Sequence, residues 1–214
     1  MTRKFETIVD TSELKLSRLE TDPFGTNAYV LTCKEKGESV LFDAPGNADL
    51  IRKFLEGSRV LYILLTHGHM DHTMALEDLY DVIGAELAAH EDDADSLPVK
   101  PDRLFYDGET IQCGNLEIEA IHTPGHTPGS LCYRLGNILI SGDTLFPGGP
   151  GKTGSPESFI RVLASIREKI LTLPDETKII PGHGDSTTVG KERQKIEAFI
   201  SRGFDQKTHG DVTW

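Results

Sequence analysis

The stretch Thr66-His67-Gly68-His69-Met70-Asp71-His72 holds four potential metal ligands. It directly follows Val60-Leu-Tyr-Ile-Leu-Leu65, a continuous apolar run that predicts a buried strand. Two histidines one residue apart cannot share a helix face, but they can converge from a tight loop that has a glycine between them. The stretch therefore predicts a metal-binding loop at the end of a strand.

Three further candidate ligands follow later apolar runs in the same way. They are His126 after 116–125, Asp143 after 137–142 and His183 after 178–182. Strand ends in a sheet meet at a common edge, so we expect all of these side chains to lie close together. Imidazoles and carboxylates without thiolates suit Zn, Fe or Mn. The set also exceeds the four ligands of a closed zinc site, which predicts either two ions or one ion that leaves some ligands free.

The order H-x-H-x-D-H, then H, D and H, resembles the metallo-β-lactamase superfamily. The segments Thr123-Pro-Gly-His-Thr-Pro-Gly129 and Gly142-Asp-Thr-Leu-Phe146 resemble its glyoxalase II-type branch most. The likeness spans about residues 25 to 190, which is nearly the whole chain. It implies an α/β fold, namely a four-layer αββα sandwich of two mixed β-sheets with helices outside and metals at one edge between the sheets.

The resemblance also implies a cofactor of two divalent metal ions, with Zn preferred and Fe or Mn as alternatives. Two ions about 3.5–4 Å apart can activate water and stabilise a developing oxyanion. Asp71 would orient the attacking hydroxide and is therefore the candidate catalytic residue. Carried over position by position, the ligands would be His67, His69 and His126 for the first ion, Asp71, His72 and His183 for the second, and Asp143 as the bridge.

The function implied by the resemblance is hydrolysis of a small thioester or related acyl compound by a metal-held hydroxide. The sequence offers no G-x-S-x-G elbow that would supply a side-chain nucleophile instead. Lys152 lies in the Gly- and Pro-rich segment 146–154, which lacks the spacing of a Walker motif. We interpret Lys152 as a candidate contact for an anionic part of the substrate, with an ordinary surface lysine as the alternative. Glyoxalase II enzymes carry a C-terminal helical region that holds glutathione, whereas only about thirty residues follow His183 here.

Other functions fit the same residues. A single iron on His67, His126 and Asp143 would form the two-histidine, one-carboxylate site of oxygen-activating enzymes, as in the similar persulfide dioxygenases. A lactonase or a β-lactamase would share the hydroxide chemistry, although Asp143 argues against a β-lactamase, whose known metal sites lack that bridge. The site could also serve binding or regulation without turnover, an alternative that the complete ligand set argues against.

Composition predicts a single enzyme domain over residues 1–214. The 34 acidic and 22 basic residues give a net charge of −12, so we expect a small-molecule substrate and neither nucleic acid nor a membrane as partner. Three cysteines without a C-x-x-C pair argue against a secreted disulfide framework. The first ten residues lack the apolar core of an export signal, and we therefore expect a cytoplasmic protein.

Local patterns predict several elements around the candidate ligands. Strands are expected at 27–33 and 39–44, and a helix whose apolar positions are Ala75, Leu79, Val82 and Ile83 should stop at Gly84. Gly-Asn pairs at 114–115 and 136–137 predict two-residue hairpins. Ser155, Pro156 and Glu157 predict the start of a helix with Phe159, Leu163, Ile166 and Ile170 as its buried stripe.

Three histidines remain outside the predicted ligand set. His90 and His122 stand at the ends of expected strands, and we interpret them as hydrogen-bonded structural residues or as partners of the ligands. His209 lies in a polar segment and is expected to be solvated.

Overall fold

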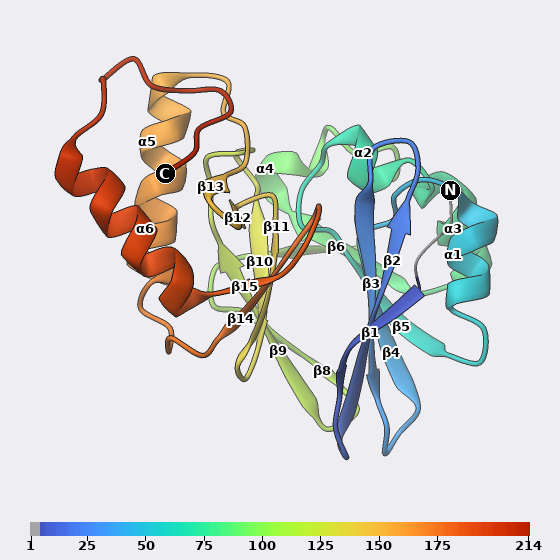
Figure 1. Cartoon of the computed structure of the whole chain (residues 1–214). Helices are drawn as coiled ribbons and strands as arrows, with labels where there is room; N and C mark the ends of the chain where they lie inside the picture. Colours follow the sequence, from blue (N-terminus) through green and yellow to red (C-terminus); the bar gives the residue numbers. More distant parts are fainter. Residues whose placement is uncertain (1–4) are drawn as a thin grey trace.

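The computed structural model describes residues 5–214 and has two β-sheets packed face to face between layers of helices (Figure 1). Met1–Lys4, the basic part of the N-terminal stretch considered for an export signal, lie outside the described residues. Within the described part of the chain, no helix has the length and apolar character needed to cross a membrane.

The first sheet has seven strands in sequence order. They are β1 (Phe5–Asp10), β2 (Leu14–Thr21), β3 (Thr26–Cys33), β4 (Glu38–Phe42), β5 (Arg59–Leu64), β6 (Glu86–His90) and β7 (Arg103–Phe105). β1 to β4 pair antiparallel, whereas β4 to β7 pair parallel. Parallel neighbours need crossover connections, which here contain α1 (Ala48–Phe54), α2 (Met70–Thr73), α3 (Leu76–Ile83) and α4 (Glu91–Ala94).

The second sheet has six strands in the order β15-β14-β11-β10-β9-β8. Its strands are β8 (Thr110–Cys113), β9 (Leu116–His122), β10 (Leu131–Leu135), β11 (Ile138–Gly142), β14 (Lys178–Pro181) and β15 (Thr187–Thr188). The Gly-Asn pairs form the predicted two-residue turns between β8 and β9 and between β10 and β11. β11 and β14 are parallel, so this sheet is mixed as well. A small ribbon of β12 (Leu145–Phe146) and β13 (Gly149–Pro150) follows Asp143.

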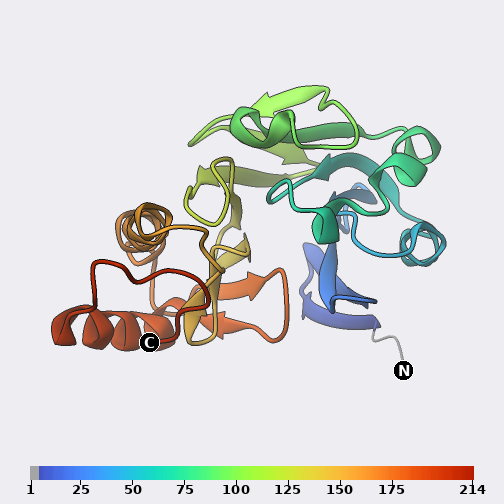
Figure 2. The same cartoon turned by 90° about the horizontal axis from the view of Figure 1, so that it is seen from above.

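Three apolar clusters hold the layers together, and Figure 2 shows the layers from above. One lies between the sheets and includes Phe42 and Tyr133. The second lies under α1 and α3 on the outer face of the first sheet, and the third lies under α5 (Pro156–Ser165) and α6 (Val189–Arg202) on the outer face of the second. The predicted four-layer αββα sandwich is therefore confirmed.

The two predicted helices form. The Ser155 side chain accepts a hydrogen bond from Ser158 N at 3.2 Å and caps α5, whose apolar stripe continues into a π-helical turn, Ile166–Ile170. α3 ends at Gly84, whose φ of 65° suits glycine. Of the apolar positions expected in this helix, Val82 points outward and is 60% exposed.

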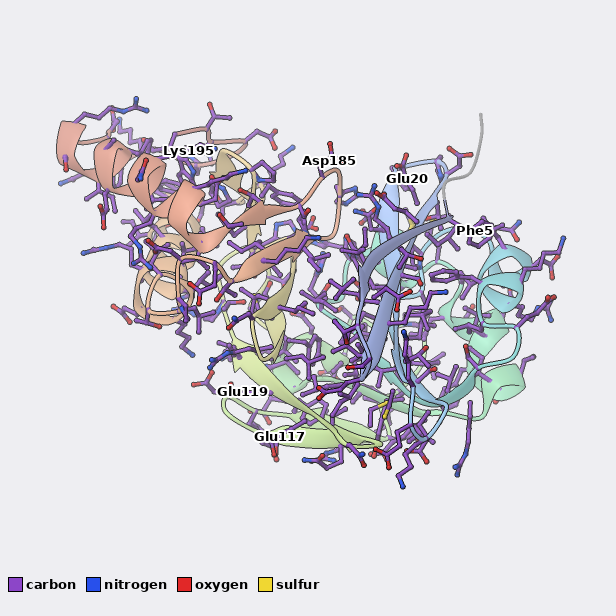
Figure 3. The ribbon with its side chains drawn as sticks, turned by 60° about the horizontal axis from the view of Figure 1, so that its bottom comes forward. Phe5, Glu20, Glu117, Glu119, Asp185 and Lys195 are labelled. Carbon is purple, nitrogen blue, oxygen red and sulfur yellow. The ribbon has the colours of Figure 1, made fainter. Side chains whose placement is uncertain are left out.

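The turn between β14 and β15 is fixed against the first sheet. Arg18 donates to Gly184 O at 2.7 Å, and Asn27 N donates to Gly182 O at 2.7 Å. Figure 3 labels Asp185 in this turn and Glu20 near the end of β2. The contacts matter because this turn carries His183, and they place it beside the edge of the sheet that carries His67 to His72.

Candidate metal centre

The strand ends singled out from the sequence meet at one edge of the two sheets, beside α2 and α4 in Figure 1. The loop with His67 and His69 follows β5, and α2 carries the next two candidates. Asp143 follows β11 and His183 follows β14. The structure thus brings all seven predicted ligands into adjoining groups.

His67, His69 and His126 form the first group, in which one ring nitrogen from each lies within 4.8 Å of the others. His67 Nε2 and His69 Nδ1 are 3.1 Å apart. The second ring nitrogen of His126, Nδ1, donates to Lys152 O at 2.8 Å, which leaves Nε2 directed at the group. This arrangement matches the predicted first metal position.

Asp71, His72 and His183 form the second group. His183 Nε2 lies 3.1 Å from Asp71 Oδ2, and His72 Nε2 lies 3.7 Å from the same oxygen. His72 is fully buried, whereas Asp71 and His183 are partly accessible. These three residues match the predicted second position.

Asp143 lies between the two groups. Its carboxylate is 3.5 Å from His126 Nε2, 3.3 Å from His72 Nε2 and 3.7 Å from His183 Nε2. Three buried polar atoms here, His72 Nε2, His126 Nε2 and Asp143 Oδ1, have no hydrogen-bond partner. Buried polar atoms without partners are costly, and a bound cation would satisfy all three, so the residues fit a metal centre.

Two glycines permit this close packing. A Cβ atom on Gly182 would lie 2.3 Å from Asp143 Oδ1, and one on Gly151 would lie 2.0 Å from Asp143 O. Because any side chain at these positions would displace Asp143 or its neighbours, both glycines are part of the construction of the site.

Asp43 is a functional residue that sequence analysis missed. It is buried at the end of β4, and its carboxylate accepts hydrogen bonds from Thr66 N at 2.7 Å and from His72 Nδ1 at 2.8 Å. A partner on one ring nitrogen fixes the orientation of the other, which here is the nitrogen directed at the second group. One signal was available in the sequence. Asp43 directly follows an apolar strand, as the candidate ligands do.

Asp93 is a second residue that was missed. This buried side chain from α4 accepts hydrogen bonds from Gly68 N at 2.9 Å, Thr127 Oγ1 at 2.7 Å and Gly129 N at 2.8 Å. It therefore joins the loop that carries His67 and His69 to the loop that carries His126. No local pattern indicates this role, because the contacts span 25 to 36 residues of sequence.

Burial and neighbouring charges set the protonation of the buried imidazoles. Burial and then the surrounding histidines hold the pKa of His67 well below its ordinary value, so this ring is neutral, as a ligand must be. Burial would also lower the pKa of His72, but the carboxylates of Asp43 and Asp143 outweigh that effect and raise it to about 10. The carboxylates therefore give His72, in the second group, a more negative environment than that of His67, in the first.

The remaining candidates lie around this centre. The Lys152 ammonium is exposed and 4.0 Å from Asp211, while its backbone carbonyl supports His126. His122 Nε2 donates to Pro128 O at 2.8 Å, and His90 Nδ1 accepts from Asp92 N at 3.1 Å.

The rings of His90 and His122 stack at 3.8 Å between centroids with 16° between their planes. Together with Asp92 they form a further group of potential ligands. However, nearly parallel rings direct their in-plane lone pairs side by side rather than at one point. His209 is exposed, as expected.

Comparison with known proteins agrees with this geometry. Residues 21–183 match the metallo-beta-lactamase superfamily, so the chain belongs to this superfamily and is one of its metallo-hydrolases. The hydroxyacylglutathione hydrolase GloC of Haemophilus influenzae is 34% identical over 194 residues, which cover 80% of this chain and 91% of that protein. The predicted superfamily is thereby confirmed, and one of the similar proteins is named as a hydroxyacylglutathione hydrolase.

Two solved structures are also similar to this chain. The chain is similar to the B3 metallo-beta-lactamase BLEG-1, with a TM-score of 0.76 and 32% identity over 84% of this chain and 96% of that one. It is also similar to TTHA1623 in a di-iron-bound form, with a TM-score of 0.71 and 29% identity over 83% of this chain and 96% of that one.

Proposed function

We propose that this protein uses two divalent metal ions to hydrolyse a small thioester. The observation that carries the proposal is the position of Asp143, whose carboxylate lies within 3.7 Å of histidines from both ligand groups. A single ion would need only one group, whereas a shared carboxylate between two complete groups suits a pair of ions.

The chain's residues would hold the ions as the sequence predicts. His67, His69 and His126 would hold the first, Asp71, His72 and His183 would hold the second, and Asp143 would be shared between them. When bound, such ions lower the pKa of water towards about 7 and polarise an acyl oxygen. Asp71 has an oxygen 3.1 Å from His183, and its position at the partly accessible side of the site suits it to orient the attacking water.

The thioester assignment is supported by the likeness to GloC, which is named a hydroxyacylglutathione hydrolase. The match covers 91% of that protein, so GloC has little length beyond the part that this chain matches. The short region after His183 is therefore no obstacle to a thioester substrate. Lys152 is proposed to meet an anionic part of the substrate, because its ammonium is exposed near the His126 loop.

The test is to purify the protein without added metal, measure Zn, Fe and Mn by elemental analysis, and assay a panel of compounds. The panel contains S-lactoylglutathione, a simple acyl thioester, an ester, a lactone, a β-lactam and a persulfide. An oxygen electrode measures whether oxygen is consumed with the persulfide. We expect about two ions per chain and fastest turnover of a thioester. Lys152→Ala should raise KM for an anionic thioester more than for a neutral one.

Other results would replace the proposal. Fastest turnover of the lactone or the β-lactam would keep the hydrolase but change its substrate. One iron per chain with oxygen consumed in the presence of the persulfide would establish a dioxygenase. Binding without turnover of any compound by metal-loaded protein would indicate a regulatory site.

A further inference from the structure

A cavity of about 450 Å³ opens directly beside the metal centre. Met70 and Met74 form one wall, and Leu97 and Pro98 form part of the other. Its volume lies within the range of about 300–1,000 Å³ that is usual for small-ligand sites.

The cavity is continuous with the metal-binding loop. Gly68, which lines it, stands between His67 and His69 in the chain, and Met70 stands between His69 and Asp71. His69 is an exposed ligand, so the centre is open to solvent next to this cavity. A substrate held at the metals can therefore extend part of its structure into the cavity.

The apolar part of the lining is formed by Met70, Met74, Leu97 and Pro98, and the polar Thr73 and Ser96 lie beside them. Met70 is 66% exposed and Met74 is 43% exposed, although large apolar side chains are usually covered. They are four positions apart, at the first residue of α2 and at its C-cap, so they lie on the same side of this short helix. Methionine side chains are flexible and polarisable and adjust to irregular apolar ligands. Glu77 is the charged residue of the lining and would repel an anionic group.

The wall opposite the methionines is rigidly connected to the ligands. Ser96 N donates to Asp93 O at 3.0 Å, and the Asp93 carboxylate holds Gly68 N. Leu97 N donates to Ala94 O at 3.3 Å. Because Asp93 connects this wall to the metal loop, the cavity keeps a fixed position relative to the reacting centre.

We infer that this methionine cavity binds the hydrocarbon part of the substrate's acyl group. The inference rests on the proposed function for the identity of the ligand. The acyl carbonyl lies at the metals, its unbranched apolar tail runs along Met70 and Met74, and Glu77 keeps charged groups out. The protein should therefore prefer longer unbranched acyl chains to acetyl.

Methionine NMR tests this directly, because the chain has only three methionines. Zinc-loaded protein with ¹³C-labelled methionine methyl groups is titrated with butanoate, hexanoate and octanoate, whose carboxylate resembles a hydrolysis product. Met70→Leu and Met74→Leu assign the signals. We expect the Met70 and Met74 signals to shift in a saturable way, and affinity to rise up to about fourfold per added methylene.

Two variants provide the comparison. Met74→Ser should lower the increase in affinity per added methylene. Val82→Ser changes an exposed apolar side chain outside the cavity and should leave this increase unchanged. Methyl signals that do not respond, or an affinity independent of chain length, would overturn the inference.

A thioester series with the same acyl chains separates this inference from the proposed function. If the thioesters are hydrolysed with a kcat/KM that does not depend on chain length, and the methyl signals do not shift, the cavity does not bind the acyl chain but the proposed hydrolase function stands. Methyl shifts with increasing affinity but no turnover support the cavity and remove the proposed reaction.

Discussion

His72 Nδ1 and Asp43 Oδ2 lie 2.8 Å apart in a buried pair that fixes the direction of the other ring nitrogen of His72. The same carboxylate accepts from Thr66 N and Oγ1, at the start of the histidine loop. One aspartate directly after β4 thus orients both the candidate ligand His72 and the loop that carries His67 and His69.

Asp43→Asn should weaken binding of one metal ion by about 10–100-fold, the usual effect of losing a partner of a metal-binding histidine. Asn tolerates the positive φ of 57° at this position, so the fold should survive. Competition with a coloured chelator measures the affinity, and Asp49→Asn on the exposed side of α1 is the matched control. Unchanged affinity for both ions would show that His72 needs no such partner.

Asp93→Asn should loosen the connection between the two ligand loops. One of its oxygens becomes an NH₂ group that cannot accept a hydrogen bond, so a buried donor on one of the loops loses its partner. Losing such a charge-assisted bond costs about 1.5–3 kcal/mol, which urea unfolding of metal-free protein measures. The exposed Asp95→Asn is the control, and equal stability of the two variants would contradict the role of Asp93.

Neighbouring histidines provide a sharp comparison at the first metal position. His126→Ala should remove one ion, because a ring nitrogen of His126 belongs to the first group. His122→Ala should retain both ions with at most about 10–100-fold lower affinity, since the His122 ring donates a hydrogen bond to Pro128 O and belongs to none of the groups that contain the predicted ligands. Elemental analysis after dialysis measures the metal content of both variants. Loss of an ion from His122→Ala but not from His126→Ala would show that His122, and not His126, is the ligand.

The sequence predicted the layers and the ligands for a simple reason. The seven candidate ligands follow four apolar strands, four of them after β5 and one after each of β9, β11 and β14, so local patterns place them at strand ends and the sheets bring these ends together. Asp43 and Asp93 could not be recognised in this way, because their roles arise from hydrogen bonds to distant loops. Helical spacing also cannot tell which flank of an apolar stripe is covered, and in α3 the side chain of Val82 is the one left exposed.

Short elements were also beyond the reach of local patterns. The ribbon of β12 and β13 consists of two-residue strands, and its backbone contacts come from far along the chain. Trp214 N donates to Gly148 O at 3.0 Å, and the buried Glu192 accepts from Gly148 N at 2.9 Å. Local sequence patterns cannot predict such contacts, because they join residues that are far apart in the sequence.

Glu192→Gln should destabilise the protein in a pH-dependent way. Burial alone would raise the pKa of Glu192, but hydrogen bonds from Gly148 N, Lys195, Thr187 and Trp214 outweigh it and hold the pKa below its ordinary 4.5. A depressed pKa in the folded state means that this stabilisation is present above 4.5 and is lost as pH falls through the folded-state value.

We therefore expect the variant to lose about 1.5–3 kcal/mol of unfolding free energy at pH 7 and less as the pH falls below 4.5. Urea unfolding of parent and variant across this range measures the difference. A difference that stays constant over the whole range would mean that the charge of Glu192 contributes nothing.

Asp143→Asn tests the shared carboxylate most directly. Asn keeps the size of the side chain but removes the charge that offsets repulsion between two cations, so electrostatics is separated from packing. We expect a folded protein that holds at most one ion tightly and loses most of its turnover. Circular dichroism checks the fold, and elemental analysis with the thioester assay checks the rest. An Asp143→Asn protein with two ions and near-normal hydrolysis would exclude a bridging role, because the histidines would then hold both cations without a shared negative charge.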